Sequence, residues 1–97
     1  MKKVYVIQSK SFFKDDRGIE YQIADYGDMP WIFTSLVRAK ASMQKRKDTR
    51  INMFNERIVS ECPDGRDSAP SLVQEFTTLN DKIDVRTVVS LWEVYTY

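Results

Sequence analysis

The chain has 97 residues, of which 42% are hydrophobic, 30% are charged and 12% are aromatic. This length fits a single domain over residues 1–97, and the composition is that of a globular protein rather than a disordered one. The formal net charge of +1 does not indicate a protein built as a whole to bind nucleic acid. Histidine is absent and Cys62 is the single cysteine, which excludes an intramolecular disulfide and any zinc site with several cysteines.

The apolar stretches are short. The first one, Val4–Ile7, is followed at once by polar residues. A signal peptide needs an apolar stretch of about 7–15 residues, and a membrane helix needs about 20. We therefore expect a soluble protein of the cytoplasm.

The N-terminal quarter predicts a β-hairpin. Residues 2–8 are rich in β-formers, and residues 19–24 alternate between apolar and polar side chains. The polar segment 14–18 between them ends in glycine and is typical of a turn. Phe12 and Phe13 extend the first strand in this interpretation.

The middle of the chain predicts one helix. Thr34 or Ser35 can cap its first turn by accepting a hydrogen bond from a free backbone N–H. Apolar residues then follow at the spacing of one helical face. They are Leu36, Ala39 and Met43. We expect a helix over 35–48, whereas segment 49–61 is compatible with either a continued helix or short strands.

The last third predicts a second helix and a final strand. Ser71 and Gln74 form a capping-box pattern, and apolar residues recur behind them at helical spacing over 71–82. Segment 85–97 is β-branched and aromatic throughout, with apolar residues on both faces. Such a strand is typical of the centre of a sheet.

Together these elements predict an α+β fold of two layers. The expected antiparallel sheet contains the N-terminal hairpin and the C-terminal strand, and the two helices pack on one of its faces.

The strongest local feature is a basic segment. Residues 1–50 carry 11 cations and 6 acids, whereas residues 51–97 carry 4 cations and 8 acids. The cations of the predicted helix and its end are Arg38, Lys40, Lys45, Arg46, Lys47 and Arg50. Three interpretations stay open: a solvated helix face, a surface steered onto an acidic protein, or a helix lying along phosphates.

Some aromatic residues stand beside predicted turns, where burial is difficult. They are Phe12, Phe13, Tyr26 and Trp31. Aromatic side chains offer large contact area at small entropic cost, which suits protein interfaces. We therefore assign these four residues, together with the six cations, to a partner-binding surface.

No group of residues predicts catalysis. The acids Asp25 and Asp28 flank a glycine and are compatible with cation binding, but turn chemistry explains them about as well, and we expect no bound metal. Cys62 has no histidine to activate it. The glycines are far apart and form no phosphate-binding loop, so we expect no cofactor and no enzymatic activity.

The outline resembles a broad set of small α+β proteins encoded by bacteria, phages and mobile elements. The resemblance is carried by the start Met1–Ile7, the junction Phe33-Thr34-Ser35 before a helix containing Ala39, and the final Leu91–Val94. Segment 50–84 departs from it as an insertion. Several proteins of this kind are phage inhibitors of host defence, including anti-CRISPR proteins. The resemblance implies such a role but carries no site residue with it.

These features favour a non-catalytic protein-binding module, and the resemblance adds that its partner is a host defence protein. The alternative is a small nucleic-acid-binding protein that uses the basic segment 38–50, and a small enzyme that works without histidine is a third hypothesis. Pairing of two copies, through an open sheet edge or through Phe12 and Phe13, is a separate expectation.

Overall fold

The computed structural model describes residues 2–23, 31–65 and 71–96. Within them the chain forms six strands and one helix. In chain order these are β1 (Lys2–Lys14), β2 (Glu20–Ile23), β3 (Trp31–Phe33), α1 (Leu36–Asn52), β4 (Arg57–Cys62), β5 (Leu72–Asn80) and β6 (Val85–Thr96).

All strands belong to one antiparallel sheet with the order β2-β1-β6-β5-β4. Its spine is the long pair β1–β6, which runs from Lys2 opposite Thr96 to Phe13 opposite Val85. The short strand β3 pairs with β1 on the same edge as β2. The predicted hairpin and the central position of the C-terminal strand are therefore confirmed, and β1 continues through both phenylalanines.

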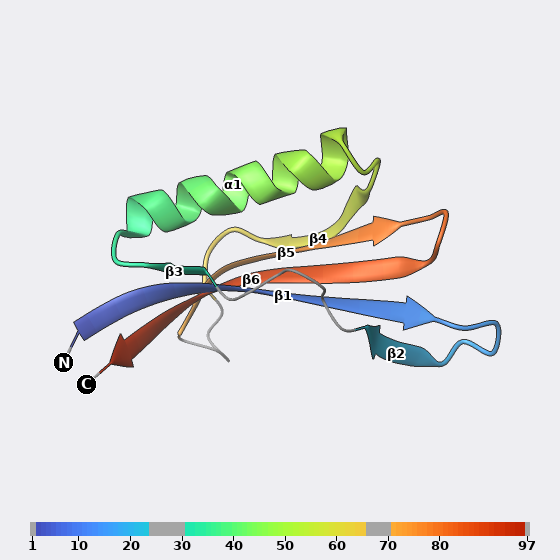
Figure 1. The fold of residues 1–97 in the computed structure, drawn as a ribbon, viewed down its shortest axis with the longest axis horizontal. Coiled ribbons are helices and arrows are strands. Elements are labelled where there is room, and N and C mark those ends of the chain that lie inside the picture. Colours follow the sequence, from blue (N-terminus) through green and yellow to red (C-terminus); the bar gives the residue numbers. More distant parts are fainter. Residues whose placement is uncertain (1, 24–30, 66–70, 97) are drawn as a thin grey trace.

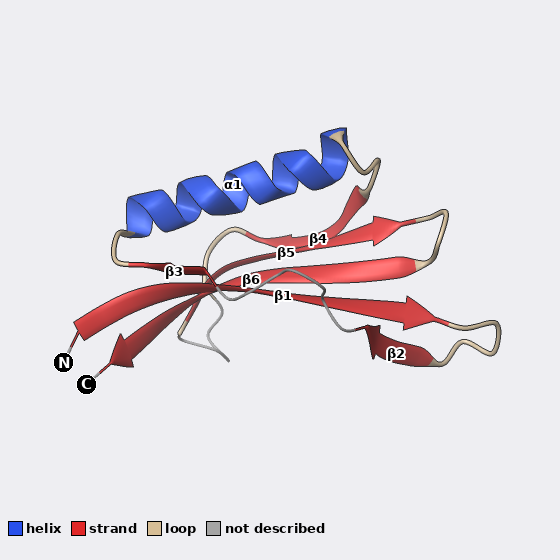
Figure 2. Ribbon diagram, in the orientation of Figure 1, coloured by secondary structure: helices blue, strands red, loops and turns tan. Residues whose placement is uncertain are grey.

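The helix α1 lies across one face of the sheet (Figures 1 and 2). The core is formed between that helix and the three central strands. Its buried members are Ile7, Ala39, Met43, Phe76, Val89 and Leu91. Successive side chains of β1 and β6 point to opposite sides of the sheet. Every second side chain therefore lies under the helix, and the others lie on the opposite face.

The helix starts where the sequence indicates. Ser35 has an extended backbone, and its hydroxyl accepts a hydrogen bond from the backbone N–H of Arg38. The helix continues past residue 48 to Asn52. Segment 49–61, for which the sequence allowed either a helix or short strands, therefore contains both. It comprises the last helical turn, a loop in which Asn55 has a φ of 53°, and strand β4.

The predicted helix over 71–82 is wrong, because this segment forms strand β5. Apolar residues at 72, 76, 79 and 83 follow a helical spacing, but the strand does not present them on one face. A register shift between Leu72 and Gln74 sets Leu72 opposite Trp92 and Phe76 opposite Val89, on opposite faces of the sheet. Ile83 lies in the turn after the strand and is 58% exposed. The carbonyl of Ser71 accepts a hydrogen bond from Glu93 instead of starting a helix. Because β5 lies between β4 and β6, backbone pairing on both edges outweighs the local pattern.

The predicted fold class is consequently wrong as well. The described residues form a mostly antiparallel β structure with one covering helix, not an α+β domain with two helices on the sheet. One helix covers less of the sheet than two would. Its 17 residues reach about 25 Å, whereas the 13 residues of β1 reach about 43 Å. The far end of the β1–β2 hairpin therefore projects beyond α1 (Figure 1).

Candidate functional site

The six cations of the predicted binding surface do not form one patch. Arg38, Lys40 and Lys45 are exposed on the outer side of α1. The other three continue the stripe that contains Ala39 and Met43, so they turn toward the sheet. They are Arg46, Lys47 and Arg50.

Two of the inward cations pair with acids that follow α1 in the chain. Arg50 donates to Glu56 at 3.1 Å, and Glu56 also accepts from the hydroxyl of Thr78 at 2.7 Å. The side chains of Arg50 and Glu56 are only 19% and 9% exposed. Lys47 forms an ion pair with Glu61 of β4. These ion pairs connect the second half of α1 to the sheet side of the fold.

Trp31 and Arg46 form a separate contact. The guanidinium of Arg46 lies 5.1 Å from the ring centre of Trp31, which is 54% exposed. This geometry is that of a cation–π interaction. Tyr26, the fourth predicted aromatic contact, lies outside the described residues.

Phe12 and Phe13 point to opposite faces of the sheet, because successive residues of a strand alternate. Phe12 lies on the face away from α1, where the guanidinium of Arg86 stacks on its ring at 4.6 Å and also pairs with Glu20. Phe13 lies on the helix side beyond the end of the helix. The predicted pair of aromatics therefore belongs to two different surfaces.

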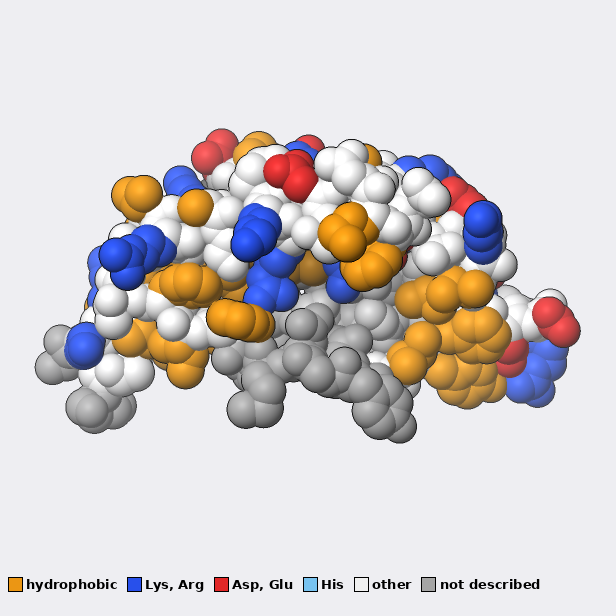
Figure 3. Space-filling view, turned by 45° about the horizontal axis from the view of Figure 1, so that its top comes forward, with side chains coloured by type: hydrophobic (Ala, Val, Ile, Leu, Met, Phe, Trp, Pro, Cys, Tyr) orange, Lys and Arg blue, Asp and Glu red, His pale blue; other side chains and the backbone are white. Residues whose placement is uncertain are grey.

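Phe13 is part of an exposed apolar cluster, which we name the tip patch. Its members are Phe13, Ile19, Tyr21 and Ile23, with exposed fractions of 40%, 45%, 46% and 36%. Register brings them together, since Phe13 is opposite Tyr21 and Ser11 is opposite Ile23. Figure 3 shows hydrophobic side chains gathered at this end of the molecule, next to charged ones.

The alternation of residues 19–24 already placed three members of the tip patch on one face. It did not show that this face would be uncovered, because the length of α1 relative to β1 decides that.

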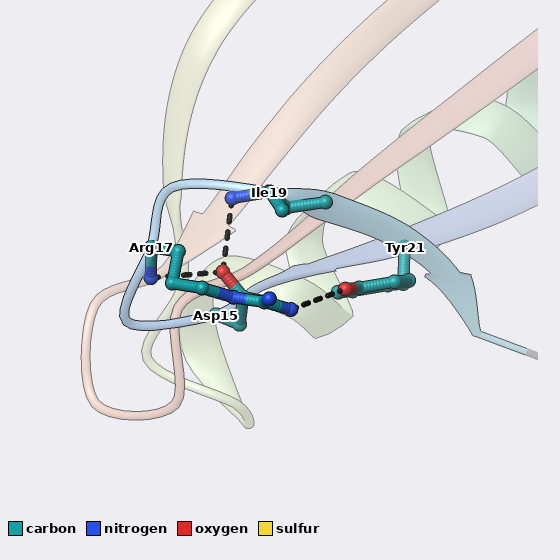
Figure 4. Close-up of polar contacts among 4 residues, drawn as sticks. All are labelled: Asp15, Arg17, Ile19 and Tyr21. Carbon is teal, nitrogen blue, oxygen red and sulfur yellow. Dashed lines mark hydrogen bonds and ion pairs between the residues drawn. The ribbon is translucent and has the colours of Figure 1, made fainter.

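The turn that carries the tip patch is fixed by Asp15 (Figure 4). One carboxylate oxygen accepts the backbone N–H groups of Arg17 and Ile19, each at 2.9 Å. The other accepts the guanidinium of Arg17 at 3.1 Å, and that guanidinium also donates to the hydroxyl of Tyr21 at 3.1 Å. Gly18 completes the turn with a φ of 81°, a backbone conformation that suits glycine.

These contacts set the charge state of the turn. Partial desolvation acts to raise the pKa of Asp15, but hydrogen bonds from Ile19, Arg17 and Tyr21 outweigh it and hold the pKa below its ordinary value. Asp15 is therefore ionised at neutral pH and organises the hairpin end from which Tyr21 projects.

The face of the sheet away from α1, which we name the helix-free face, is the other candidate surface. Along β1 and β6 it presents Val6, Gln8, Lys10, Phe12, Arg86, Val88, Ser90, Trp92 and Val94. Three shallow hollows of about 230, 240 and 290 Å³ follow one another along it. Neighbouring hollows share lining residues, so they form one continuous groove. The sequence indicated apolar residues on both faces of β6 but not which face α1 would leave open.

The described residues hold no group of three or more Asp, Glu, His or Cys side chains that could bind a metal ion. The thiol of Cys62 lies 2.6 Å from the carbonyl of Asp64. Among the helices of the described part, none has the length and apolar character needed to cross a membrane.

No protein-family model, curated protein or solved structure matches this chain.

Proposed function

We propose that the protein is a non-catalytic binding module whose tip patch docks onto a partner protein. The observation that carries this proposal is the gathering of two aromatic and two aliphatic side chains, each 36% exposed or more, on one hairpin end. Contiguous apolar patches on a soluble domain mark interaction sites more often than single exposed residues do. Tyr21 combines an apolar ring with a hydroxyl, which is typical of residues that dominate interface energies.

The rigidity of the hairpin end supports the proposal. The Asp15 turn and the Arg17–Tyr21 hydrogen bond hold the patch in place before any partner arrives. A preformed surface loses less conformational entropy on binding than a flexible loop does. Charges of both signs around the patch, from Asp15, Asp16 and Arg17, supply the polar rim that surrounds the apolar centre of an interface.

The alternative function, nucleic-acid binding along the basic helix, has less support from the geometry. Lys47 and Arg50 are engaged by acids, and Arg46 lies against Trp31. The three cations on the outer side of α1 are Arg38, Lys40 and Lys45. Three positive charges are few for a surface that must replace the counterions condensed on a nucleic acid.

A role against a host defence protein in the bacterial cytoplasm is the narrower form of the proposal, and it rests on the sequence resemblance alone.

The test compares two variants with matched loss of exposed apolar surface. Tyr21→Ser removes a ring from the tip patch, and Val37→Ser removes an exposed apolar side chain from the outer side of α1. Partners captured from a bacterial lysate by the unaltered protein are purified, and their dissociation constants are measured by calorimetry. We expect Tyr21→Ser to weaken binding at least about tenfold, as loss of an interface hot spot does, and Val37→Ser to leave it unchanged.

A third variant, Lys40→Glu, separates the two hypotheses. The proposal is wrong if binding depends on Lys40 and not on Tyr21, because the helix surface would then be the site. It is also wrong if Tyr21→Ser and Val37→Ser have equal effects. Circular dichroism of all three variants checks that the fold is retained.

A further inference from the structure

We propose that the outer edge of strand β2 binds β2 of a second copy of the chain, so that the two sheets join edge to edge with these strands antiparallel. β2 stands at one end of the strand order and pairs on its inner edge with β1. In the described part of the chain, no backbone group is hydrogen-bonded to its outer edge. Unpaired N–H and C=O groups on an edge strand are a template for another extended strand.

The hairpin register shows which backbone groups of β2 point outward. The N–H of Asp15 donates to the carbonyl of Ile19 at 2.9 Å, so this carbonyl points toward the side of β1. Backbone groups reverse their direction from one residue of a strand to the next. Those of Tyr21 therefore also point toward β1, whereas the N–H and C=O groups of Glu20 and Gln22 point outward.

The two outer edges of the sheet differ in their protection against such pairing. The other end strand, β4, contains a register shift between Ile58 and Ser60 and carries two charged residues. Bulges and charges are the usual devices that keep a sheet edge from pairing. β2 pairs with β1 without a register shift, and the charge of its single ionic residue, Glu20, is already paired with Arg86 of β6. β2 is therefore the less protected edge.

The sequence of segment 19–23 is complementary to itself. A two-fold axis perpendicular to the sheet, midway between the two copies of Tyr21, places these tyrosines opposite each other. It also places Ile19 of each copy opposite Ile23 of the other, with all of these side chains on the helix side. Glu20 of each copy is then opposite Gln22 of the other. The outward backbone groups of both strands become paired, and each carboxylate lies beside an amide that can donate to it.

Other registers of the two strands are less favourable. An axis at Glu20 would oppose two carboxylates, and like charges directly opposite each other destabilise a sheet. An axis at Gln22 would move Ile19 beyond the end of the other copy's β2. The axis at Tyr21 alone pairs every apolar residue of the segment with another apolar residue. A second copy always carries this pattern, whereas the strand of an unrelated protein would have to match it.

The fold leaves the outer edge of β2 accessible to a second sheet. Strand β3 lies on the same side of β1, but it pairs with Tyr5–Ile7, whereas β2 pairs with Ser11–Lys14. The helix α1 ends before it reaches the hairpin end (Figure 1). The assembly is a continuous sheet in which the tip patches of both copies adjoin on the helix side. Because each copy contributes one short strand, we expect a reversible dimer rather than a permanent one.

Two substitutions at one position measure the contribution of the backbone. Gln22→Pro removes an outward N–H that β1 does not use, as an edge strand tolerates, whereas Gln22→Ala removes the side chain and keeps the N–H. We expect Gln22→Pro to raise the dissociation constant of the dimer at least about tenfold, because each strand loses a hydrogen bond. Gln22→Ala should have a much smaller effect. Sedimentation velocity measures the constants, and circular dichroism checks the fold of both variants.

A cross-linking experiment tests the register without relying on proline. In a Cys62→Ser background, Tyr21→Cys places a thiol opposite its own copy at a non-hydrogen-bonded pair, where Cα atoms are about 4.5 Å apart and a disulfide can form. Ile19→Cys is the matched control, because Ile19 and Tyr21 are 45% and 46% exposed but Ile19 lies opposite Ile23 of the other copy. Under mild oxidation, Tyr21→Cys should cross-link at least about tenfold faster.

Four outcomes would overturn the proposal. The first is a protein that stays monomeric up to millimolar concentration, and the second is an equal effect of Gln22→Pro and Gln22→Ala on the dimer. The third is equal cross-linking at positions 19 and 21. The fourth is a monomer that loses a captured partner protein on Gln22→Pro, because the edge would then bind a strand of that partner. The docking of the tip patch is tested separately, by comparing Tyr21→Ser with Val37→Ser.

Discussion

Ile7 and Phe13 belong to the same strand and point to the same side of the sheet, yet Ile7 is 2% exposed and Phe13 is 40% exposed. The difference comes from α1, which covers Ile7 and ends before it reaches Phe13. Under the helix, apolar side chains and inward cations hold two layers together. Beyond it, a single layer of sheet keeps its apolar residues at the surface. The comparison shows that the length of α1, and not hydrophobicity alone, decides whether an apolar side chain of β1 is buried in the core or exposed in the tip patch.

The largest loss of stability is expected in the region that α1 covers. Phe76→Ala removes a ring that is 1% exposed between α1 and the sheet, and we expect a loss of about 3–5 kcal/mol in the free energy of unfolding. Phe13→Ala, in the uncovered tip patch, should cost no more than about 1 kcal/mol. Urea denaturation of both variants measures the two losses. Equal losses would mean that the tip patch is part of the core.

The next effect concerns the charges that fasten the helix. Arg50→Ala leaves the nearly buried carboxylate of Glu56 without its cation, and we expect a loss of about 2 kcal/mol. Arg57→Ala breaks the ion pair of Arg57 and Asp81, whose side chains are 59% and 60% exposed, and should reduce the stability much less because solvent screens the pair. Thermal unfolding of the two variants tests the difference, and a larger loss for Arg57→Ala would contradict it.

A smaller effect is expected where the covering helix begins. Ser35→Ala removes the hydroxyl that accepts from Arg38, which should reduce the free energy of unfolding by about 1 kcal/mol. Thr34→Ala, at the preceding exposed position, is the matched control and should have little effect. If the two substitutions are equivalent, the hydroxyl of Ser35 is not the cap.

The smallest effect is confined to the tip. Because the pKa of Asp15 is lowered in the folded protein, its stabilising contribution is complete above the ordinary value of 3.8 and is lost as pH falls through the lower folded value. Amide resonances of Arg17 and Ile19 should therefore shift over that acidic interval. Asp15→Asn should abolish the shift, whereas Asp16→Asn should preserve it. Unchanged resonances throughout the interval would show that the carboxylate does not hold the turn.

The N-terminal hairpin, the start of α1 and the central C-terminal strand could be predicted because each has a local cause. The turn needs Gly18, the helix needs the hydroxyl of Ser35, and segment 85–97 is rich in β-branched and aromatic residues. Segment 71–82 was assigned wrongly because its apolar residues follow a helical spacing in the sequence, and only pairing with β4 and β6 shows that the segment is a strand.

The candidate site also combines features that the sequence predicts with features that only the fold sets. The sequence by itself determined that Phe13 is apolar, that Ile19, Tyr21 and Ile23 share a face, and that α1 is basic. The tertiary structure decided that Lys47 and Arg50 turn inward to Glu61 and Glu56, and that α1 leaves Phe13 uncovered. The physical reason is that exposure and ion pairing depend on what distant segments cover, whereas turns, caps and strand propensity depend on neighbouring residues.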